Sequence, residues 1–399
     1  MKAVCFSSAV LGVAALFACG CGGGSSGMSV KTSPACVPTP NWETSYVLTG
    51  YQVNMFSMNS CTGQFSAATP ASVGTGYAFP QDNSEEMVTD PLGRFAYVAN
   101  LVSNASDLST ISMYTINSST GILTPTTPAT VATGWFPQEI AIDPKGRFVY
   151  TANSDDATVS MFTINQSTGV LTPTTPATVS TMQPGQALSQ PSFLTVDPSG
   201  KFLYVTESQT YGAAVLMYDI NQTTGFLTPT SPSAVYTGGI PWQVVITPSE
   251  KFAYVVNNLS GGSMTDGVWQ FAVNPETGLL TPNNPSYVAA GNAPTAIAVD
   301  PTSSFAYVVN RLDGDVSMYT IDPDTGNLSP NVTATNSTGV VAAGSEPFRI
   351  AFDPSGKFVY VTDEDGAASV FTVNSDGTLA SAGLTGTAGL ATAFTTLNP

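Results

Sequence analysis

Histidine is absent from this chain of 399 residues, and charged side chains make up only 9% of it. Histidine is the side chain that most often acts as a general base or a metal ligand near neutral pH. Its absence excludes every Ser/His/Asp and Cys/His catalytic arrangement. Typical soluble domains contain about 25% charged residues, so the surface polarity of this chain has to come from hydroxyl and amide side chains.

Basic residues are especially scarce, because 10 Lys and Arg stand against 27 Asp and Glu, for a formal net charge of −17. Nucleic acid is excluded as a partner, since phosphate backbones are bound by clustered Lys and Arg. The sequence also lacks a Walker-type loop and a dinucleotide fingerprint, so we expect no cofactor. Six of the basic residues belong to one recurring turn, namely Arg94, Lys145, Arg147, Lys201, Lys251 and Lys357.

Long apolar runs are missing too, and the stretch from Ala9 to Ala18 is too short to cross a bilayer. It follows Lys2 and precedes Leu16-Phe17-Ala18-Cys19-Gly20, which resembles a bacterial lipobox. The resemblance implies cleavage before Cys19 and a lipid on that cysteine. We therefore predict a lipoprotein signal peptide at 1–18, a lipid-anchor cysteine and flexible tether at 19–40, and a folded domain at 41–399. The chain would then be exported and anchored to a bacterial membrane, in the periplasm or at the cell surface. An ordinary secretory signal is the alternative.

Cysteine is also rare, with five copies, two of which fall after the Gly-rich part of the expected tether. Export would place Cys36 and Cys61 in an oxidising compartment, where a disulfide between them is plausible. Two unpaired thiols are the alternative.

What the chain does contain is an internal repeat of 50 to 54 residues. A tyrosine recurs at Tyr46, Tyr97, Tyr150, Tyr204, Tyr254, Tyr307 and Tyr360, and a glycine recurs at Gly63, Gly121, Gly169, Gly225, Gly278, Gly326 and Gly377. Each unit reads as four short strands separated by an Asp-Pro-x-Gly turn, a loop and an Asn-x-x-Thr-Gly turn. The fourth strand carries two prolines, which confine it to a sheet edge.

These units predict an all-β fold, a seven-bladed β-propeller with four-stranded antiparallel blades. The first tyrosine unit has no inner strand ahead of it, whereas the chain ends with Leu390 to Pro399, which resembles one. We therefore expect the C-terminal strand to join the N-terminal blade and close the ring. Six blades plus a decayed unit, or a stacked solenoid, are the alternatives.

Tyr97-Val98-Ala99-Asn100, Tyr254-Val255-Val256-Asn257 and Tyr307-Val308-Val309-Asn310 resemble the YVTN propeller repeat. Together with the two turns, they make the chain similar to the lactonase-like propellers, a family that includes 6-phosphogluconolactonase and the muconate cyclases. The resemblance implies a site of His, Arg and Glu at the mouth of the central channel. The inner-strand entries of this chain carry no histidine, so that residue has no counterpart here.

The loops that precede the first strands and follow the second strands share one face of a propeller, which we call the mouth. Arg311 and Arg349 fall there outside the turn pattern, and two guanidiniums can bind a carboxylate or phosphate. Glu139 lies at another entry and is a candidate general base. Trp135, Trp242 and Phe348 are candidate ligand-stacking residues. Structural ion pairs and packing between blades are the alternatives. No loop has the spacing of a calcium site, so we predict no metal.

Three functions remain open. The leading hypothesis is a non-catalytic module that binds a small anionic or sugar-like ligand, or a protein, at the mouth. A divergent lactonase with Glu139 as the base, and a structural repeat protein of the envelope, are the alternatives. We expect the chain to act as a monomer.

Overall fold

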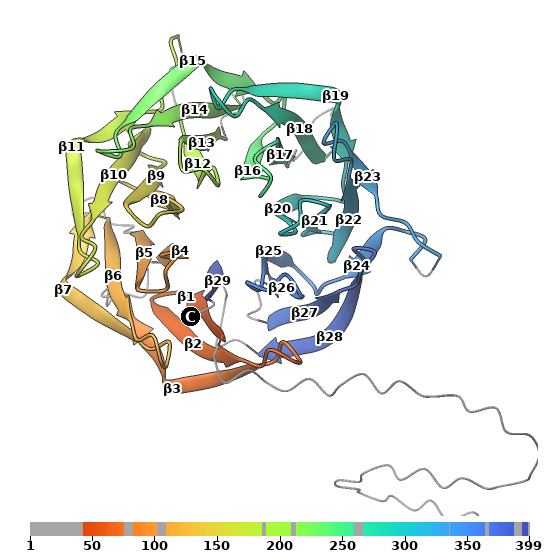
Figure 1. Ribbon diagram of the computed structural model, residues 1–399, viewed down its shortest axis with the longest axis horizontal. Coiled ribbons are helices and arrows are strands. Elements are labelled where there is room, and N and C mark those ends of the chain that lie inside the picture. The colour runs from red at the N-terminus through yellow and green to blue at the C-terminus, as the bar shows by residue number, and fades with distance from the viewer. Residues whose placement is uncertain are drawn as a thin grey trace, which may run out of the picture. The chain divides into compact units, whose positions relative to one another are not determined.

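The computed structural model describes residues 43–75, 83–101, 109–185, 189–208, 213–258, 266–334, 336–363, 367–386 and 393–397. Seven antiparallel sheets are arranged in a ring around one axis (Figure 1), and we call the centre of this ring the channel. The predicted fold, an all-β propeller of seven four-stranded blades, is confirmed. The predicted signal peptide, Cys19, the tether and Cys36 lie outside the described residues. Cys61 is disulfide-bonded, and its pairing with Cys36 stays a prediction.

We number the blades 1 to 7 in chain order and their strands from the channel to the rim. The inner strands are β29 (Ala393–Leu397), β4 (Asn83–Thr89), β8 (Pro137–Ile142), β12 (Pro191–Val196), β16 (Pro241–Ile246), β20 (Pro294–Val299) and β25 (Pro347–Phe352). The second strands are β1 (Glu43–Thr49), β5 (Phe95–Leu101), β9 (Phe148–Asn153), β13 (Phe202–Glu207), β17 (Phe252–Asn257), β21 (Phe305–Asn310) and β26 (Phe358–Asp363).

The third strands are β2 (Gln52–Met58), β6 (Thr110–Ile116), β10 (Thr158–Ile164), β14 (Ala214–Ile220), β18 (Gly267–Val273), β22 (Asp315–Ile321) and β27 (Ala367–Val373). The outer strands are β3 (Phe65–Gly74), β7 (Leu123–Ala132), β11 (Leu171–Ser180), β15 (Leu227–Tyr236), β19 (Leu280–Ala289), β23 (Leu328–Pro330) with β24 (Val340–Ala342), and β28 (Leu379–Gly386). The strands with two internal prolines, such as β7 and β11, thus lie at the rim, as predicted.

The ring closes as the sequence predicts. β29 pairs antiparallel with β1, with Tyr46 opposite Thr395, so the C-terminal strand is the inner strand of blade 1. This arrangement leaves neither end of the repeat array with an uncovered sheet face.

Adjacent blades are joined by the two sequence markers of the repeat. The hydroxyl of Tyr150 donates to the carbonyl of Gly225 in the next blade at 2.9 Å. The same bond recurs around the ring, and Tyr360 closes it by donating to Gly63 at 3.1 Å. Burial raises the pKa well above the usual range for six of these tyrosines, Tyr46, Tyr97, Tyr150, Tyr204, Tyr254 and Tyr307. The hydroxyls therefore stay protonated donors at physiological pH.

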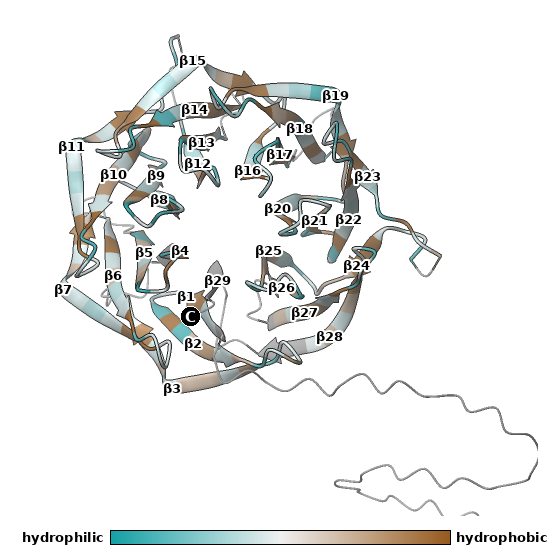
Figure 2. Cartoon of the chain, in the orientation of Figure 1, coloured by the Kyte–Doolittle hydropathy of each residue, from teal (hydrophilic) through white to brown (hydrophobic). Residues whose placement is uncertain are grey.

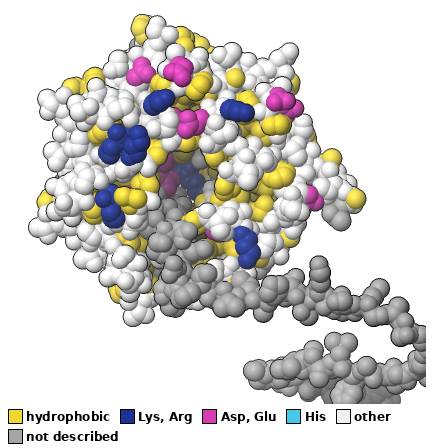
Figure 3. Space-filling model, in the orientation of Figure 1, with side chains coloured by type: hydrophobic (Ala, Val, Ile, Leu, Met, Phe, Trp, Pro, Cys, Tyr) yellow, Lys and Arg dark blue, Asp and Glu magenta, His cyan; other side chains and the backbone are white. Residues whose placement is uncertain are grey.

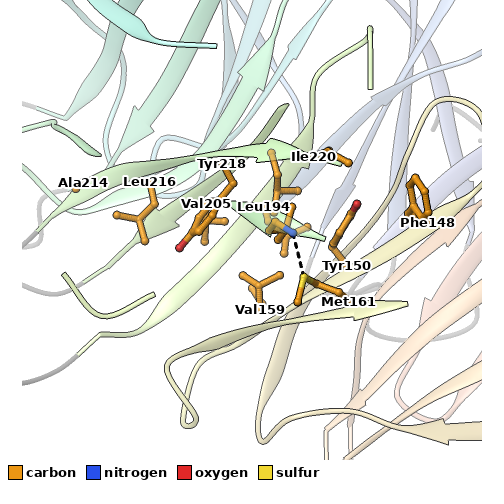
Figure 4. Packing of buried hydrophobic residues seen from close by; sticks show 13 residues of the cluster. Phe148, Tyr150, Val159, Met161, Leu194, Val205, Ala214, Leu216, Tyr218 and Ile220 are labelled. Atoms are coloured by element: carbon orange, nitrogen blue, oxygen red, sulfur yellow. Dashed lines mark hydrogen bonds between the residues drawn. The ribbon is translucent and has the colours of Figure 1, made fainter. Parts of the chain in front are cut away.

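The hydrophobic core lies between blades rather than within one blade. Figure 4 shows Tyr150 and Met161 of blade 3 packed against Leu194 and Val205 of blade 4. The sulfur of Met161 accepts a hydrogen bond from the Leu227 amide at 3.3 Å. Figure 2 shows the outer strands β7, β11, β15 and β19 in pale and hydrophilic colours. Second strands are buried on both faces, which explains why they lack alternation of apolar and polar residues.

Candidate functional site

The candidate site lies where the inner strands enter the channel. β4, β8 and β25 each contain a register shift near this end, between Ser84 and Glu86, Pro137 and Glu139, and Pro347 and Arg349. Bulges of this kind re-aim side chains and are frequent beside active sites. Glu86, Glu139 and Arg349 all follow the bulge, so three different blades place a charged side chain at the same level of the channel.

Arg349 crosses the channel to two carboxylates. Its Nη2 lies 3.0 Å from Oε2 of Glu86 and 3.9 Å from Oε2 of Glu139. The three side chains are only 18%, 11% and 7% exposed, in the order Arg349, Glu86 and Glu139. Blade 7 is thereby linked to blades 2 and 3. Figure 3 shows acidic and basic side chains at the bottom of the central hollow.

The two carboxylates have different surroundings. Oε1 of Glu86 also accepts a hydrogen bond from the Met87 amide at 3.1 Å. Burial raises the pKa of Glu139 well above its usual range, and the Glu86 charge adds to this, while Arg349 and the Ile140 amide lower it. Burial beside a second carboxylate is one of the arrangements by which enzymes raise the pKa of a catalytic carboxyl group.

Two buried polar atoms of the site have no hydrogen-bond partner among the described residues. They are Oε2 of Glu139 and Nε of Arg349. Buried polar groups are normally satisfied, and 3.9 Å is too long for a direct hydrogen bond between Arg349 Nη2 and Glu139 Oε2. These atoms can therefore bond a water or a ligand.

Arg349 also faces a cavity of about 290 Å³ on the mouth side. Its lining comes from blades 3, 4, 5 and 7, and consists of Gln138, Ser192, Phe193, Ser208, Trp242, Phe348 and Arg349. The guanidinium lies over the Phe348 ring, 5.2 Å from its centroid. The cavity combines aromatic faces, amide and hydroxyl groups and one cation, which is typical of a small-molecule site.

The sequence-predicted site residues fall into two groups. Arg349, Trp242 and Phe348 line the cavity, and Glu139 does not line it but lies 3.9 Å from Arg349. Arg311 instead pairs with Glu346 at 3.0 Å and does not line this cavity. Trp135 is 41% exposed and its amide donates to Asp156, so it too lies outside the cavity.

Acidic loops near the mouth provide no metal centre in the part of the chain that the structure describes, where no three potential ligands cluster. Within the same ranges, no helix is both long and apolar enough to traverse a bilayer.

Comparison with known proteins identifies the family. The family described as "Lactonase, 7-bladed beta-propeller" matches residues 40–186, 174–263 and 230–342. The chain belongs to this family.

Two curated members of the lactonase family match over a short segment. The 6-phosphogluconolactonases of Pectobacterium carotovorum and Pectobacterium atrosepticum are 36% and 33% identical to this chain over 93 residues. That segment covers 22% of this chain and 27% of each relative. The match thus spans only about a quarter of the curated relatives' length.

Solved structures of lactonase-like proteins share the fold over nearly the whole length. A putative 6-phosphogluconolactonase from Bacteroides fragilis superposes with a TM-score of 0.71 at 21% identity, covering 90% of this chain and 98% of that one. The periplasmic gluconolactonase of Pseudomonas aeruginosa gives 0.66 at 18% identity, covering 90% and 99%. At these identities the likeness concerns the fold alone.

Sequence reasoning missed Glu86, although this lactonase propeller carries a signal that could have found it. Glu86, Glu139 and Arg349 each lie 11 residues before the key tyrosine of their blade, at Tyr97, Tyr150 and Tyr360. The entry of blade 2 reads Asn83-Ser84-Glu85-Glu86 and lacks the proline that marks the entries of blades 3 to 7. Counting back from the tyrosine, instead of looking for proline, would have located it. Ser208, another cavity residue, carried no such signal.

Proposed function

We propose that this protein hydrolyses a lactone at the mouth of its central channel, with Glu139 as the general base and Arg349 as the group that stabilises the oxyanion. One observation carries the proposal. A buried carboxyl with a raised pKa lies 3.9 Å from a guanidinium that lines a small-molecule cavity, and each group has an unsatisfied polar atom. Membership of the lactonase family supports the same reaction class.

The chemistry needs only these two groups and water. In its ionised form Glu139 takes a proton from a water molecule as the water oxygen bonds to the lactone carbonyl carbon. Arg349 stabilises the negative charge that develops on the carbonyl oxygen. The carbonyl re-forms as the ring C–O bond breaks, and Glu139 returns the proton to the leaving oxygen. The product is a hydroxy acid.

Glu86 keeps the Arg349 guanidinium in place and raises the pKa of Glu139. A carboxylate with a raised pKa accepts a proton from water more readily than an ordinary carboxylate does. In this proposal Glu86 is a positioning residue, because it acts on substrate through Arg349 and Glu139.

The test is turnover of simple lactones by the purified propeller, corrected for spontaneous hydrolysis. Replacing Glu139 by Gln should lower kcat by about 10² to 10⁴-fold, the usual contribution of a general base. The wild-type rate should rise with pH through the raised pKa of Glu139, because only the ionised form is a base, and this rise should vanish in Glu139→Gln.

Glu276→Gln is the matched control, because Glu276 is an exposed residue of an Asn-x-x-Thr-Gly turn at the end of the blade away from the mouth. It should retain wild-type turnover. Equal turnover in Glu139→Gln and wild type would exclude Glu139 as the base.

A non-catalytic binding module is the second candidate, and the close Arg349–Glu86 pair favours it. At 3.0 Å and with little exposure, this ion pair also serves as a bridge between blades. If no lactone is turned over while sugar acids still raise the melting temperature of the propeller, the binding module is the better description.

A further inference from the structure

The cavity at the mouth has almost no net positive charge to offer a ligand. Among the lining residues that the structure describes, Arg349 is the only charged one. Its guanidinium lies 3.0 Å from the Glu86 carboxylate, and Glu139 is the next acidic neighbour at 3.9 Å. A phosphate monoester carries close to two negative charges at neutral pH and is usually bound by one or more uncompensated Arg or Lys side chains. Here the single cation is already neutralised.

No other Lys or Arg side chain of the propeller can supply the missing positive charge in place of Arg349. In the sequence after Lys31, the only Lys and Arg outside the recurring turn are Arg311 and Arg349. Arg311 pairs with Glu346 at 3.0 Å. The turn residues, such as Arg147, lie at the far end of six-residue inner strands, about 15–20 Å from the mouth.

The rest of the lining suits a neutral polyol. Phe193, Trp242 and Phe348 supply apolar ring faces, on which the C–H faces of a sugar ring can stack. Gln138 and Ser192 supply an amide and a hydroxyl, which both donate and accept hydrogen bonds. Such groups pair with hydroxyls without requiring a charge on the ligand.

We infer that the lactone bound at this site carries no phosphate group. The class of ligand is then the lactones of unphosphorylated sugar acids. The inference rests on the proposed function for turnover, whereas the charge argument concerns binding and can be measured separately. The Pectobacterium relatives are named for a phosphorylated lactone, so this chain would differ from them in specificity.

The first experiment compares kcat/KM of the wild-type propeller for glucono-1,5-lactone and for its 6-phosphorylated form at pH 7 and low salt. We expect the unphosphorylated lactone to be preferred by about tenfold or more, because the phosphate meets no uncompensated cation in a partly desolvated channel. Equal or better use of the phosphorylated lactone would overturn the inference and leave the proposed lactone hydrolysis intact.

A variant with an added positive charge tests whether charge determines the preference between the two lactones. Ser208→Lys places a cation on the cavity wall, and should shift the ratio of the two kcat/KM values toward the phosphorylated lactone by about tenfold. Ser208→Gln is the matched control of similar length without the charge, and should leave that ratio unchanged. A Lys variant that behaves like the Gln variant would count against charge as the discriminating factor.

Absence of turnover with both lactones would refute the proposed hydrolysis but not end the test. Calorimetric titration with gluconate and 6-phosphogluconate then compares binding alone. Tighter binding of gluconate supports the inference. Equal or tighter binding of 6-phosphogluconate, or no binding of either, overturns it.

Discussion

The charged residues of the channel owe their role to one position of the repeat, 11 residues before the key tyrosine. In blades 2, 3 and 7 this position holds Glu86, Glu139 and Arg349, while in blades 4, 5 and 6 it holds Phe193, Gln243 and Ala296. Because the same bulge precedes each, the ring directs unlike side chains to one level of the channel. Variation at a single repeat position is thus enough to assemble a site on a repetitive scaffold.

The raised pKa of Glu139 also makes a prediction about stability. Native Glu139 holds its proton to higher pH than the unfolded chain does, where a glutamate has a pKa of about 4.3. The native state therefore binds more protons between these two pKa values, and its free energy of unfolding falls as pH rises through that window.

Glu139→Gln cannot lose a proton, so this decline should be smaller in the variant. Urea unfolding at pH 4, 6 and 8 should show the variant gaining stability relative to wild type as pH rises. Glu276→Gln provides the baseline for removal of an exposed carboxylate. Parallel curves for wild type and Glu139→Gln would mean that Glu139 ionises as easily in the folded protein as in the unfolded chain.

At the scale of the element, the blade depends on the glycine that follows its third strand. Gly225 has a φ of +72°, and a Cβ there would lie 2.4 Å from the Phe148 ring of the preceding blade. The glycine thus serves both the turn and the contact between blades, while its carbonyl accepts the Tyr150 bond. Two requirements on one residue explain why this marker recurs in every unit.

Gly225→Ala should therefore cost more than an alanine at a glycine that serves only a turn. Gly93 has a φ of +66°, and a Cβ added there would meet no atom within 4 Å, so Gly93→Ala should lose about 1 kcal/mol for the backbone alone. Gly225→Ala should lose a further 1–3 kcal/mol or so for overpacking against Phe148. Denaturant unfolding of the two variants measures the difference. Equal losses of unfolding free energy would show that the packing around Phe148 adjusts to the added methyl group at no cost.

At the scale of the whole molecule, stability depends on closing the ring. β29 supplies five residue pairs to β1 and covers the channel side of blade 1, between β25 and β4. Without it, the inner edge of β1 would be left without its partner strand.

Truncation after residue 391 should consequently lower the free energy of unfolding by more than about 3 kcal/mol, which exceeds the usual effect of a surface change. Truncation after Leu397 removes only the two residues beyond β29 and is the control. Thermal unfolding followed by circular dichroism compares them. An unchanged midpoint in the longer truncation would show that the ring holds without its closing strand.

Much of the architecture could be predicted because its determinants repeat. The recurring tyrosine and glycine indicated the number of blades. In the structure, the tyrosine hydroxyl of one blade donates a hydrogen bond to the glycine carbonyl of the next. Proline in the fourth strand indicated the rim, since it cannot donate to a ladder. The missing inner strand at the start and the surplus strand at the end predicted closure.

The candidate site was less predictable from the same pattern. Sequence position placed Arg349 and Glu139 at the mouth, but it could not show that Arg349 reaches across to Glu86, which comes from a blade two places away. It also grouped Arg311 with Arg349, whereas Arg311 forms an ion pair with Glu346, just before the inner strand of the next blade. The length and direction of a side chain decide such partners, and a repeat pattern contains neither.

The sequence by itself determined the number of blades, their strand order and the way the ring closes, because each of these follows from local turn chemistry and hydrophobic pattern that every unit repeats. Only the tertiary structure decided which charged groups meet in the channel, how far Glu139 is buried, and that Arg349 is neutralised by Glu86. Those properties depend on distances between residues far apart in the chain, which exist only once seven blades stand around one axis.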